Sequence, residues 1–197
     1  MPTWRRGERY SPEMSAQATV LWFTGMSGAG KSTLANGLRD ALQGAGRKVL
    51  ILDGDDVRTR LHRHLGFTPE DIRLNNELIV GLCEKHRADH DYILVPIISP
   101  YRDSRAAARR RLSPSFHEIY VHAALDVLHD RDTKGLYGAA RRKEIDNLIG
   151  VSPSSPYEVP VSPDLKIDTG MEVLGLAQSR LLSFALDCRA PVGRRVQ

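Results

Sequence analysis

The stretch from residue 25 to residue 33 combines three glycines with a lysine and three hydroxyl side chains. It is GMSGAGKST, which fits the pattern G-x-x-x-x-G-K-[ST] and lies between a short apolar run and a helical pattern. Backbone N–H groups without bulky side chains can curl around a phosphate, and the following helix directs its positive end at it. We therefore predict a phosphate-binding loop for a nucleotide, made of Gly25, Met26, Ser27, Gly28, Ala29, Gly30, Lys31, Ser32 and Thr33.

Two side chains of this loop have a defined chemistry in the motif. Lys31 reaches the β- and γ-phosphates of the nucleotide, and the Ser32 hydroxyl binds Mg²⁺. The loop alone does not separate kinases from GTPases or motor ATPases. The guanine-reading motif N/T-K-x-D is missing, because Thr133-Lys134-Gly135-Leu136 lacks the aspartate. The 197 residues are also too few for the additional domains of most motors.

A second group of polar residues follows the next apolar run along the chain, in the sequence LDGDDVR at residues 52–58. The carboxyl ends of parallel strands share one edge of a sheet, so Asp53, Asp55 and Arg58 are expected to face the phosphate-binding loop. A carboxylate there can accept the proton of an attacking hydroxyl or orient the metal, and an arginine can bind an anionic acceptor. The alternative is an acidic turn in which Asp55 or Asp56 caps a helix.

The elements that must position these groups alternate along the chain. Apolar, β-rich runs predict strands at Val20–Thr24, Val49–Leu52, Tyr92–Ile98, Glu118–Val121 and Leu165–Asp168. Helical patterns lie near residues 31–43, 70–89, 102–112, 125–131 and 172–187. This alternation predicts an α/β fold, with a parallel sheet of about five strands and helices on both faces.

Two segments do not follow the alternation. Residues 1–17 are expected to form a loose N-terminal arm, and residues 18–190 a single domain. Residues 132–163 contain several glycines and the sequence VSPSSP, which indicates a long loop. Within it, residues 132–156 are predicted to be a mobile lid.

Composition limits the classes of partner. The apolar content is 41%, no segment is long and apolar enough for a membrane span, and the first residues lack the apolar middle of a signal peptide, so we expect a cytoplasmic protein. The net charge is +4, and the basic run at residues 105–112 has no aromatic residues among its arginines. That pattern is more typical of a solvated helix face than of a nucleic-acid surface.

Several short motifs make the chain resemble the adenylylsulfate (APS) kinases. They are FTGMSGAGKST, LDGDDVR, LGFTPEDIRLNN, IISPYRDSR, RDTKGLYGAAR, SPYEVP and IDT, in the order and spacing of that family. The resemblance runs from about residue 20 to about residue 175 and includes several motifs specific to the family. It implies a P-loop kinase fold and transfer of the ATP γ-phosphate to the 3′-hydroxyl of APS, with Mg²⁺, as in sulfate assimilation.

The resemblance also implies roles for individual residues. By this resemblance, Asp55 is the general base and Lys31 is also a catalytic residue. Ser99 matches a serine that some descriptions of the family give as a phosphoserine intermediate, whereas direct in-line transfer needs no such step. Arg131 and Lys134 would lie at the lid and the nucleotide. The expected acceptor contacts are Asp53, Asp55, Arg58, Phe67, Asn75, Ile98, Ser99, Lys134 and Leu148.

The chain departs from the family on the acceptor side. Ile72 stands where the family has an arginine, and Leu148 where it has a phenylalanine. The loop that follows Leu148 is two residues longer than in the family. Three interpretations therefore stay open: an APS kinase, a kinase for another nucleotide or a sugar-like metabolite of specialised metabolism, and a nucleotide-binding regulator that has lost turnover. A homodimer is left open as well.

Overall fold

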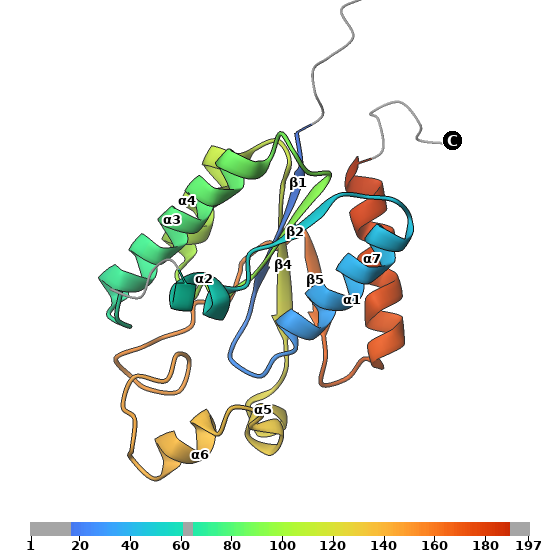
Figure 1. Ribbon diagram of the computed structural model, residues 1–197. Helices are drawn as coiled ribbons and strands as arrows, with labels where there is room; N and C mark the ends of the chain where they lie inside the picture. The colour runs from blue at the N-terminus through green and yellow to red at the C-terminus, as the bar shows by residue number, and fades with distance from the viewer. Residues whose placement is uncertain (1–16, 61–64, 190–197) are drawn as a thin grey trace, which may run out of the picture.

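The computed structural model describes residues 17–60 and 65–189 and has one five-stranded sheet at its centre (Figure 1). The strands are β1 (Thr19–Thr24), β2 (Val49–Ile51), β3 (Tyr92–Pro96), β4 (Phe116–His122) and β5 (Leu165–Asp168). All four strand pairs are parallel, and the order across the sheet is β2-β3-β1-β4-β5. The predicted parallel α/β sheet is therefore confirmed.

Helices cover both faces of the sheet. On one face lie α1 (Lys31–Gly44) and α7 (Leu174–Arg189), and on the other α3 (Pro69–His86) and α4 (Arg102–Leu112) (Figure 1). Three shorter helices lie toward the carboxyl ends of the strands: α2 (Gly54–Arg60), α5 (Leu125–Arg131) and α6 (Leu136–Arg141). The carboxyl edge of the sheet therefore carries the connections that form the site.

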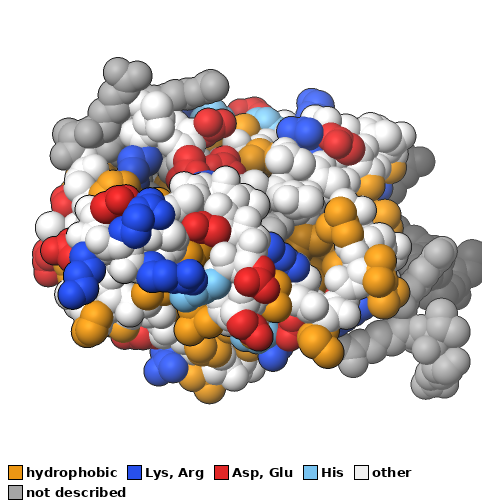
Figure 2. Space-filling model, turned by 90° about the horizontal axis from the view of Figure 1, so that it is seen from below, with side chains coloured by type: hydrophobic (Ala, Val, Ile, Leu, Met, Phe, Trp, Pro, Cys, Tyr) orange, Lys and Arg blue, Asp and Glu red, His pale blue; other side chains and the backbone are white. Residues whose placement is uncertain are grey.

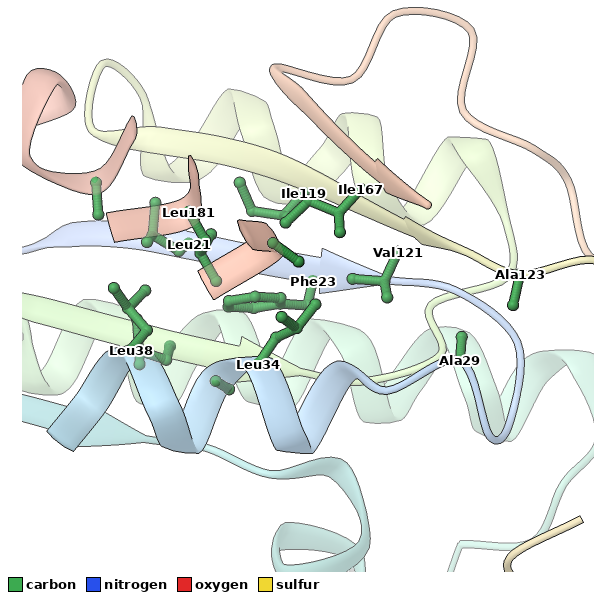
Figure 3. Close-up of a cluster of buried hydrophobic side chains, with 14 of the residues drawn as sticks. Leu21, Phe23, Ala29, Leu34, Leu38, Ile119, Val121, Ala123, Ile167 and Leu181 are labelled. Carbon is green, nitrogen blue, oxygen red and sulfur yellow. The ribbon is translucent and has the colours of Figure 1, made fainter. Parts of the chain in front are cut away.

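Strand β1 divides the core into two layers because its side chains alternate between the faces. Leu21 and Phe23 point toward α1 and α7, where they pack with the apolar side chains seen in Figure 3. Val20 and Trp22 point to the other face, and the Trp22 ring lies 5.9 Å from the ring of Phe116. Every residue of β1 is buried, as expected for the central strand of a sheet that is covered on both faces.

The start of α3 is fixed by a reciprocal pair of side-chain contacts. The Thr68 hydroxyl accepts a hydrogen bond from the Asp71 backbone N–H at 3.1 Å, while the Asp71 carboxylate accepts one from the Thr68 N–H at 3.4 Å. Pro69 occupies the first turn, where its fixed φ favours the helix. This capping box sets the rotation of α3, which carries Ile72 and Asn75 toward the site.

The structure differs from the expected elements in several bounds and in two short helices. The third strand ends at Pro96 rather than Ile98, and α3 ends at His86 rather than at residue 89. The short helices α2 and α6 lie in segments expected to be loops. Helix α6 forms because the Asp132 carboxylate accepts hydrogen bonds from the N–H groups of Tyr137 and Gly138, at 3.0 and 2.8 Å. The expected arm, residues 1–17, lies outside the described residues except for Gln17.

Candidate active site

A cavity of about 210 Å³ lies where β1 passes into α1. It is lined by Ser27, Gly28, Gly30, Lys31, Ser32, Thr33, Asp53, Gly54, Asp55, Pro96, Ile97, Ile98, Thr133 and Lys134. Gly30 precedes α1 with φ 92°, and no side chain of a described residue caps that helix end. The first N–H groups of α1 are thus left for a ligand, as at an anion site. We call this space the phosphate cavity.

Gly25 sets how closely the loop approaches the sheet. Its φ is 155°, and a Cβ at this position would lie 2.2 Å from the backbone oxygen of Val121 in β4. Because that oxygen belongs to the sheet, it cannot move aside. The loop can therefore pass over the end of β4 only with a glycine here.

Lys31 is buried at the base of the loop. Its ammonium group donates to the backbone oxygens of Gly25 and Met26, both at 2.8 Å. Burial lowers the pKa of Lys31 from 10.5 to about 8, and the nearby charge of Lys134 acts in the same direction. A phosphate in the cavity would supply the negative charge that this lysine lacks.

Hydroxyl and carboxylate oxygens meet beside the loop. The Ser32 hydroxyl donates to Asp53 at 2.8 Å, and the other oxygen of Asp53 accepts from the Asp55 N–H at 3.0 Å. The Asp55 carboxylate is exposed and forms an ion pair with Lys134 across the cavity. Serine and aspartate oxygens are the ligand type that Mg²⁺ prefers, so Ser32 and Asp53 are the residues that can hold it.

A second cavity, of about 70 Å³, adjoins the first, and we call it the acceptor cavity. It is lined by Gly54, Asp55, Arg58, Phe67, Ile72, Asn75, Asn76, Ile97, Ile98, Ser99, Pro100 and Ile149. Gly54, Asp55, Ile97 and Ile98 line both cavities. The Asp55 carboxylate therefore stands at the boundary between the two spaces.

Arg58 is the one basic side chain among the described residues that line the acceptor cavity. Its guanidinium carbon lies 4.6 Å from the centre of the exposed Phe67 ring, and the group donates to the backbone oxygens of Leu65 and Gly66. Burial lowers the pKa of Arg58, against the opposing effect of Asp71 and Asp55. The arginine is thus held in place and is suited to bind an anion.

The opposite wall of the acceptor cavity is apolar. Ile72 from α3 and Ile149 from the lid pack together with Tyr101, and all three are buried. Leu148 does not line the cavity: its side chain belongs to the core cluster on the α1 and α7 face. The structure therefore puts Ile149, the next residue along the chain, where the sequence suggested Leu148.

A third cavity, of about 360 Å³, continues from the phosphate cavity past Thr33 and Thr133 toward α7. It is lined by Gly28, Gly30, Thr33, Leu34, Arg131, Thr133, Thr169, Glu172, Leu174 and Ala177. The Arg131 guanidinium donates to the Thr169 hydroxyl at 3.0 Å. The three cavities form one path, from this end through the phosphate cavity to the acceptor cavity.

The lid contacts the phosphate-binding loop through Tyr137. Its hydroxyl donates to the Ser27 backbone oxygen at 2.7 Å, and burial raises the pKa of Tyr137 to about 12. Asp132 turns the chain into the lid, and the backbone N–H groups of Tyr137 and Gly138 lower its pKa. The lid therefore begins at a carboxylate that is held ionised.

Most of the predicted site residues are brought together on this path. Within the predicted loop, Gly25, Met26 and Ala29 do not line the phosphate cavity, although Gly25 and Met26 hold Lys31 through their backbone oxygens. Several lining residues were not predicted: Asn76, Pro100, Thr133, Ile149, Thr169, Glu172 and Leu174. The motif IDT already contained the signal for Thr169.

Comparison with known proteins agrees with this arrangement. A family model described as adenylylsulphate kinase matches residues 17–168. The chain belongs to the adenylylsulfate kinase family. The adenylyl-sulfate kinase of Prochlorococcus marinus is 43% identical over 181 residues, which is 91% of this chain and 89% of that protein.

Solved structures of the family have the same fold. The Mycobacterium tuberculosis APS kinase in complex with AMPPNP and APS has a TM-score of 0.79 and 32% identity, covering 87% of this chain and 98% of that one. The hexameric APS kinase from Thiobacillus denitrificans has a TM-score of 0.64 and 30% identity, covering 88% of this chain and 29% of that one. The protein is a kinase that uses ATP and transfers phosphate to an alcohol group.

The charges on this member of the family are interspersed on the lid side of the molecule, where Figure 2 shows basic and acidic side chains next to one another. On α4, Arg105 pairs with Glu118 at 2.7 Å, Arg109 with Asp164 at 2.6 Å, and Arg111 with a glutamate of α3 at 2.5 Å. The basic run of the sequence is thus used largely in ion pairs.

Among the described residues, no helix has the length and apolar content that a membrane span requires.

Proposed function

We propose that this enzyme transfers the γ-phosphate of ATP to the 3′-hydroxyl of adenylyl sulfate, with Mg²⁺. The observation that carries the proposal is the position of Asp55, which lines both the phosphate cavity and the acceptor cavity. A hydroxyl presented from the acceptor cavity can give its proton to this carboxylate while it attacks a phosphate next to Lys31. Phosphoryl transfer needs little more than this positioning and charge neutralisation.

Each part of the path has a role in this reaction. Lys31 and the N–H groups at the start of α1 bind the phosphates, and Arg131 with Thr169 lies where the nucleoside would extend. Ser32 and Asp53 would hold Mg²⁺, which supplies charge for the phosphate oxygens when bound. Arg58 and Phe67 offer a cation and an aromatic face to a sulfated nucleotide.

The lid, residues 132–156, is proposed to close over the phosphates and exclude water. Lys134 is the part of it that reaches the reacting groups, since it contacts Asp55 and lines the phosphate cavity. When ATP is present, its γ-phosphate offers Lys134 a second anionic partner. Asp55 is then released to accept a proton.

The apolar wall of the acceptor cavity favours a second candidate, a kinase for a different nucleotide or a sugar-like alcohol. Ile72 and Ile149 give no charge to an anionic group, so Arg58 must bind it without a second arginine from α3. The lack of a second basic side chain costs less binding free energy for an acceptor with a smaller anionic group, or none, than for adenylyl sulfate.

Steady-state kinetics separate the two candidates. The purified protein is given ATP·Mg²⁺ with adenylyl sulfate, adenosine nucleotides or sugar alcohols, and release of ADP is followed together with the phosphorylated product. A kcat/KM for adenylyl sulfate above roughly 10⁴ M⁻¹s⁻¹ supports the proposal, since that is the ordinary enzymatic range. A much higher kcat/KM for another acceptor would contradict it.

We also propose that the chain forms a homodimer in the cytoplasm, where ATP is supplied. The hexameric state of the Thiobacillus denitrificans relative supports self-association. Light scattering coupled to size exclusion, at several protein concentrations, tests the assembly. A monomer at every concentration would contradict it.

A further inference from the structure

Four polar residues meet in the interior where β1 ends, one of them, Ser99, through its backbone oxygen. They are Thr24, Ser99, Arg105 and Tyr157, and we call this group the junction. Thr24, Ser99 and Arg105 are 0%, 2% and 3% exposed. Buried polar groups of this kind are expensive unless each has a partner, so the contacts among them fix their positions closely.

The junction holds one wall of the acceptor cavity in an unusual conformation. Ser99 lines that cavity and has φ 42°, a left-handed backbone that a side chain disfavours. The Thr24 hydroxyl donates to the Ile98 backbone oxygen at 2.7 Å, and Arg105 donates to the Ser99 backbone oxygen at the same distance. The Asn76 amide donates to the Ser99 hydroxyl at 3.0 Å.

The junction also fixes Tyr157 and Glu158, the two residues that directly follow the lid, which we call the lid end. The Tyr157 hydroxyl lies 2.9 Å from the Thr24 hydroxyl, and because the Thr24 proton is donated to the Ile98 backbone oxygen, Tyr157 is the donor in this pair. Burial raises the pKa of Tyr157, so its proton is retained. Arg105 donates to the Glu158 backbone oxygen at 2.6 Å, and the Glu158 N–H donates to the Pro100 backbone oxygen at 2.9 Å.

Arg105 is itself fixed from a third side. Its Nε lies 2.7 Å from the Glu118 carboxylate of β4, and both side chains are largely buried. One guanidinium therefore joins the cavity wall at Ser99, the lid end at Glu158 and the central sheet at Glu118. Lysine could not make these three contacts, because its charge is a single point on a flexible stem.

We infer that the junction couples the lid end to the shape of the acceptor cavity, with Arg105 and Tyr157 as positioning residues for the acceptor. Neither side chain lines the acceptor cavity, so each acts through Ser99 and its neighbours. A shift of the lid end moves Tyr157 and Glu158, and through Thr24, Arg105 and Pro100 the backbone around Ser99. The inference rests on the proposed acceptor cavity.

The test removes the Tyr157 hydroxyl and measures the KM for the acceptor and the KM for ATP separately. In Tyr157→Phe, the KM for the acceptor should rise about fivefold, the effect of one neutral hydrogen bond. The KM for ATP should stay within about twofold, because the phosphate cavity keeps its contacts. Tyr92→Phe is the matched control: its buried hydroxyl binds the Ala185 backbone oxygen at 3.2 Å, away from the three cavities, so both KM values should be unchanged.

A double-mutant cycle isolates the contact itself. Thr24→Val is nearly isosteric and removes the partner of Tyr157, so the acceptor KM of Thr24→Val/Tyr157→Phe should equal that of Thr24→Val alone. Additive effects of the two substitutions would overturn the inference. So would an unchanged acceptor KM in Tyr157→Phe, and the Thr24→Val variant still provides a reading if Tyr157→Phe does not fold.

Hydrogen exchange of the ligand-free protein keeps this inference separate from the proposed function. The Glu158 amide should exchange at least about fivefold faster in Tyr157→Phe, since its acceptor at Pro100 is no longer held in place. This result is independent of the acceptor's identity. A wild-type protein inactive on adenylyl sulfate would overturn the proposed substrate, whereas unchanged Glu158 exchange would overturn the junction.

Discussion

Asp55 lies between Lys134 and the acceptor cavity, and replacing one of its carboxylate oxygens tests whether it acts as the general base. Lys134 pairs with it across the phosphate cavity, while on its other side begins the acceptor cavity. Asp55→Asn keeps the size but cannot accept the proton, so kcat should fall by about a hundredfold or more, the usual scale for loss of a general base. Steady-state turnover at saturating substrates measures kcat, and calorimetry without acceptor should show that ATP affinity is kept.

The next residue along the chain provides the control for Asp55. Asp56 is exposed on the same helix and lines neither cavity, so Asp56→Asn should leave kcat unchanged within about twofold. Full activity in Asp55→Asn would show that the proton has another route. Asp55 would then be a structural partner of Lys134.

The lowered pKa of Lys31 predicts that ATP affinity depends on pH. Burial lowers its pKa to about 8 in the free protein, and ATP binds the protonated form. As the pH rises above about 8, the free enzyme loses this proton, and ATP affinity should fall up to tenfold per pH unit. Calorimetric titration between pH 7 and pH 9.5 measures the slope, roughly over the window that the shifted pKa defines.

Two variants test whether the slope belongs to Lys31. An arginine stays charged over this range, so Lys31→Arg should bind ATP with little pH dependence, even if its shape weakens binding. Lys85→Ala removes an exposed lysine of α3 and should keep the wild-type slope. A wild-type affinity that is flat up to pH 9.5, well above the lysine's pKa of about 8, would contradict the assignment.

The sequence was most informative where function depends on neighbours in the chain. Lys31, Ser32 and Asp53 could be predicted because one motif fixes the first two and the end of the next strand fixes the third. The sequence could not show that Ile149 rather than Leu148 lines the acceptor cavity, since the direction of each side chain depends on how the lid packs. Asn76 was not predicted because its contact with Ser99 joins residues far apart in the chain.

At the scale of elements, the passage from β1 to α1 depends on Gly25. A Cβ there meets the Val121 backbone oxygen of β4 at 2.2 Å, so Gly25→Ala must push the loop off the sheet. We expect the free energy of unfolding to fall by about 2 kcal/mol or more and ATP binding to be lost. Urea denaturation and calorimetry provide the two measurements.

Gly44, the last residue of α1, provides the comparison for Gly25. An added Cβ there meets nothing within 4 Å, so Gly44→Ala should be neutral or stabilise by roughly 0.5 kcal/mol. An equal loss of stability in both variants would mean that the contact with Val121 is not the cause. ATP affinity should be unchanged in Gly44→Ala.

The lid is the element expected to move. Gly135 and Gly150 both have positive φ, of 67° and 82°, and between them the lid reaches the phosphate-binding loop through Tyr137. The lid also packs through Leu148 and Ile149, but most of residues 141–147 are exposed. We therefore predict that amide exchange over residues 132–156 is fast in the free protein and is slowed by a non-hydrolysable ATP analogue with acceptor. Mass spectrometry of hydrogen exchange measures it, with β1 as the slow reference. Equal protection with and without ligands would mean a static loop.

The longer helices could be predicted and the short ones could not. The predicted bounds of the helix at residues 102–112 are those of α4, whose sequence consists largely of alanine and arginine, both strong helix formers. Helix α6 has six residues and depends on the Asp132 carboxylate, a contact that no local pattern reveals. The segment of α2 was expected to be a loop facing the phosphate-binding loop, with a capped helix only as the alternative, because its seven residues are too few to show a helical period.

At the scale of the whole molecule, the three cavities form a single path along the carboxyl edge of the sheet. Ligands bound there stabilise only the folded protein, so each should raise the melting temperature. With an ATP analogue and Mg²⁺ at about 100 times Kd, the added stability is about 2.7 kcal/mol. For a chain of 197 residues this corresponds to a rise of roughly 5–11 °C.

Thermal shifts can also assign the two substrates to the phosphate cavity and the acceptor cavity. Arg58 lines the acceptor cavity and not the phosphate cavity, so Arg58→Ala should keep the shift with the ATP analogue and lose most of the additional shift with adenylyl sulfate. Lys31→Ala should lose the shift with the ATP analogue, because the γ-phosphate charge goes uncompensated. Differential scanning fluorimetry of both variants and the wild type provides the measurement. An adenylyl sulfate shift of wild-type size in Arg58→Ala would mean that the acceptor anion binds elsewhere.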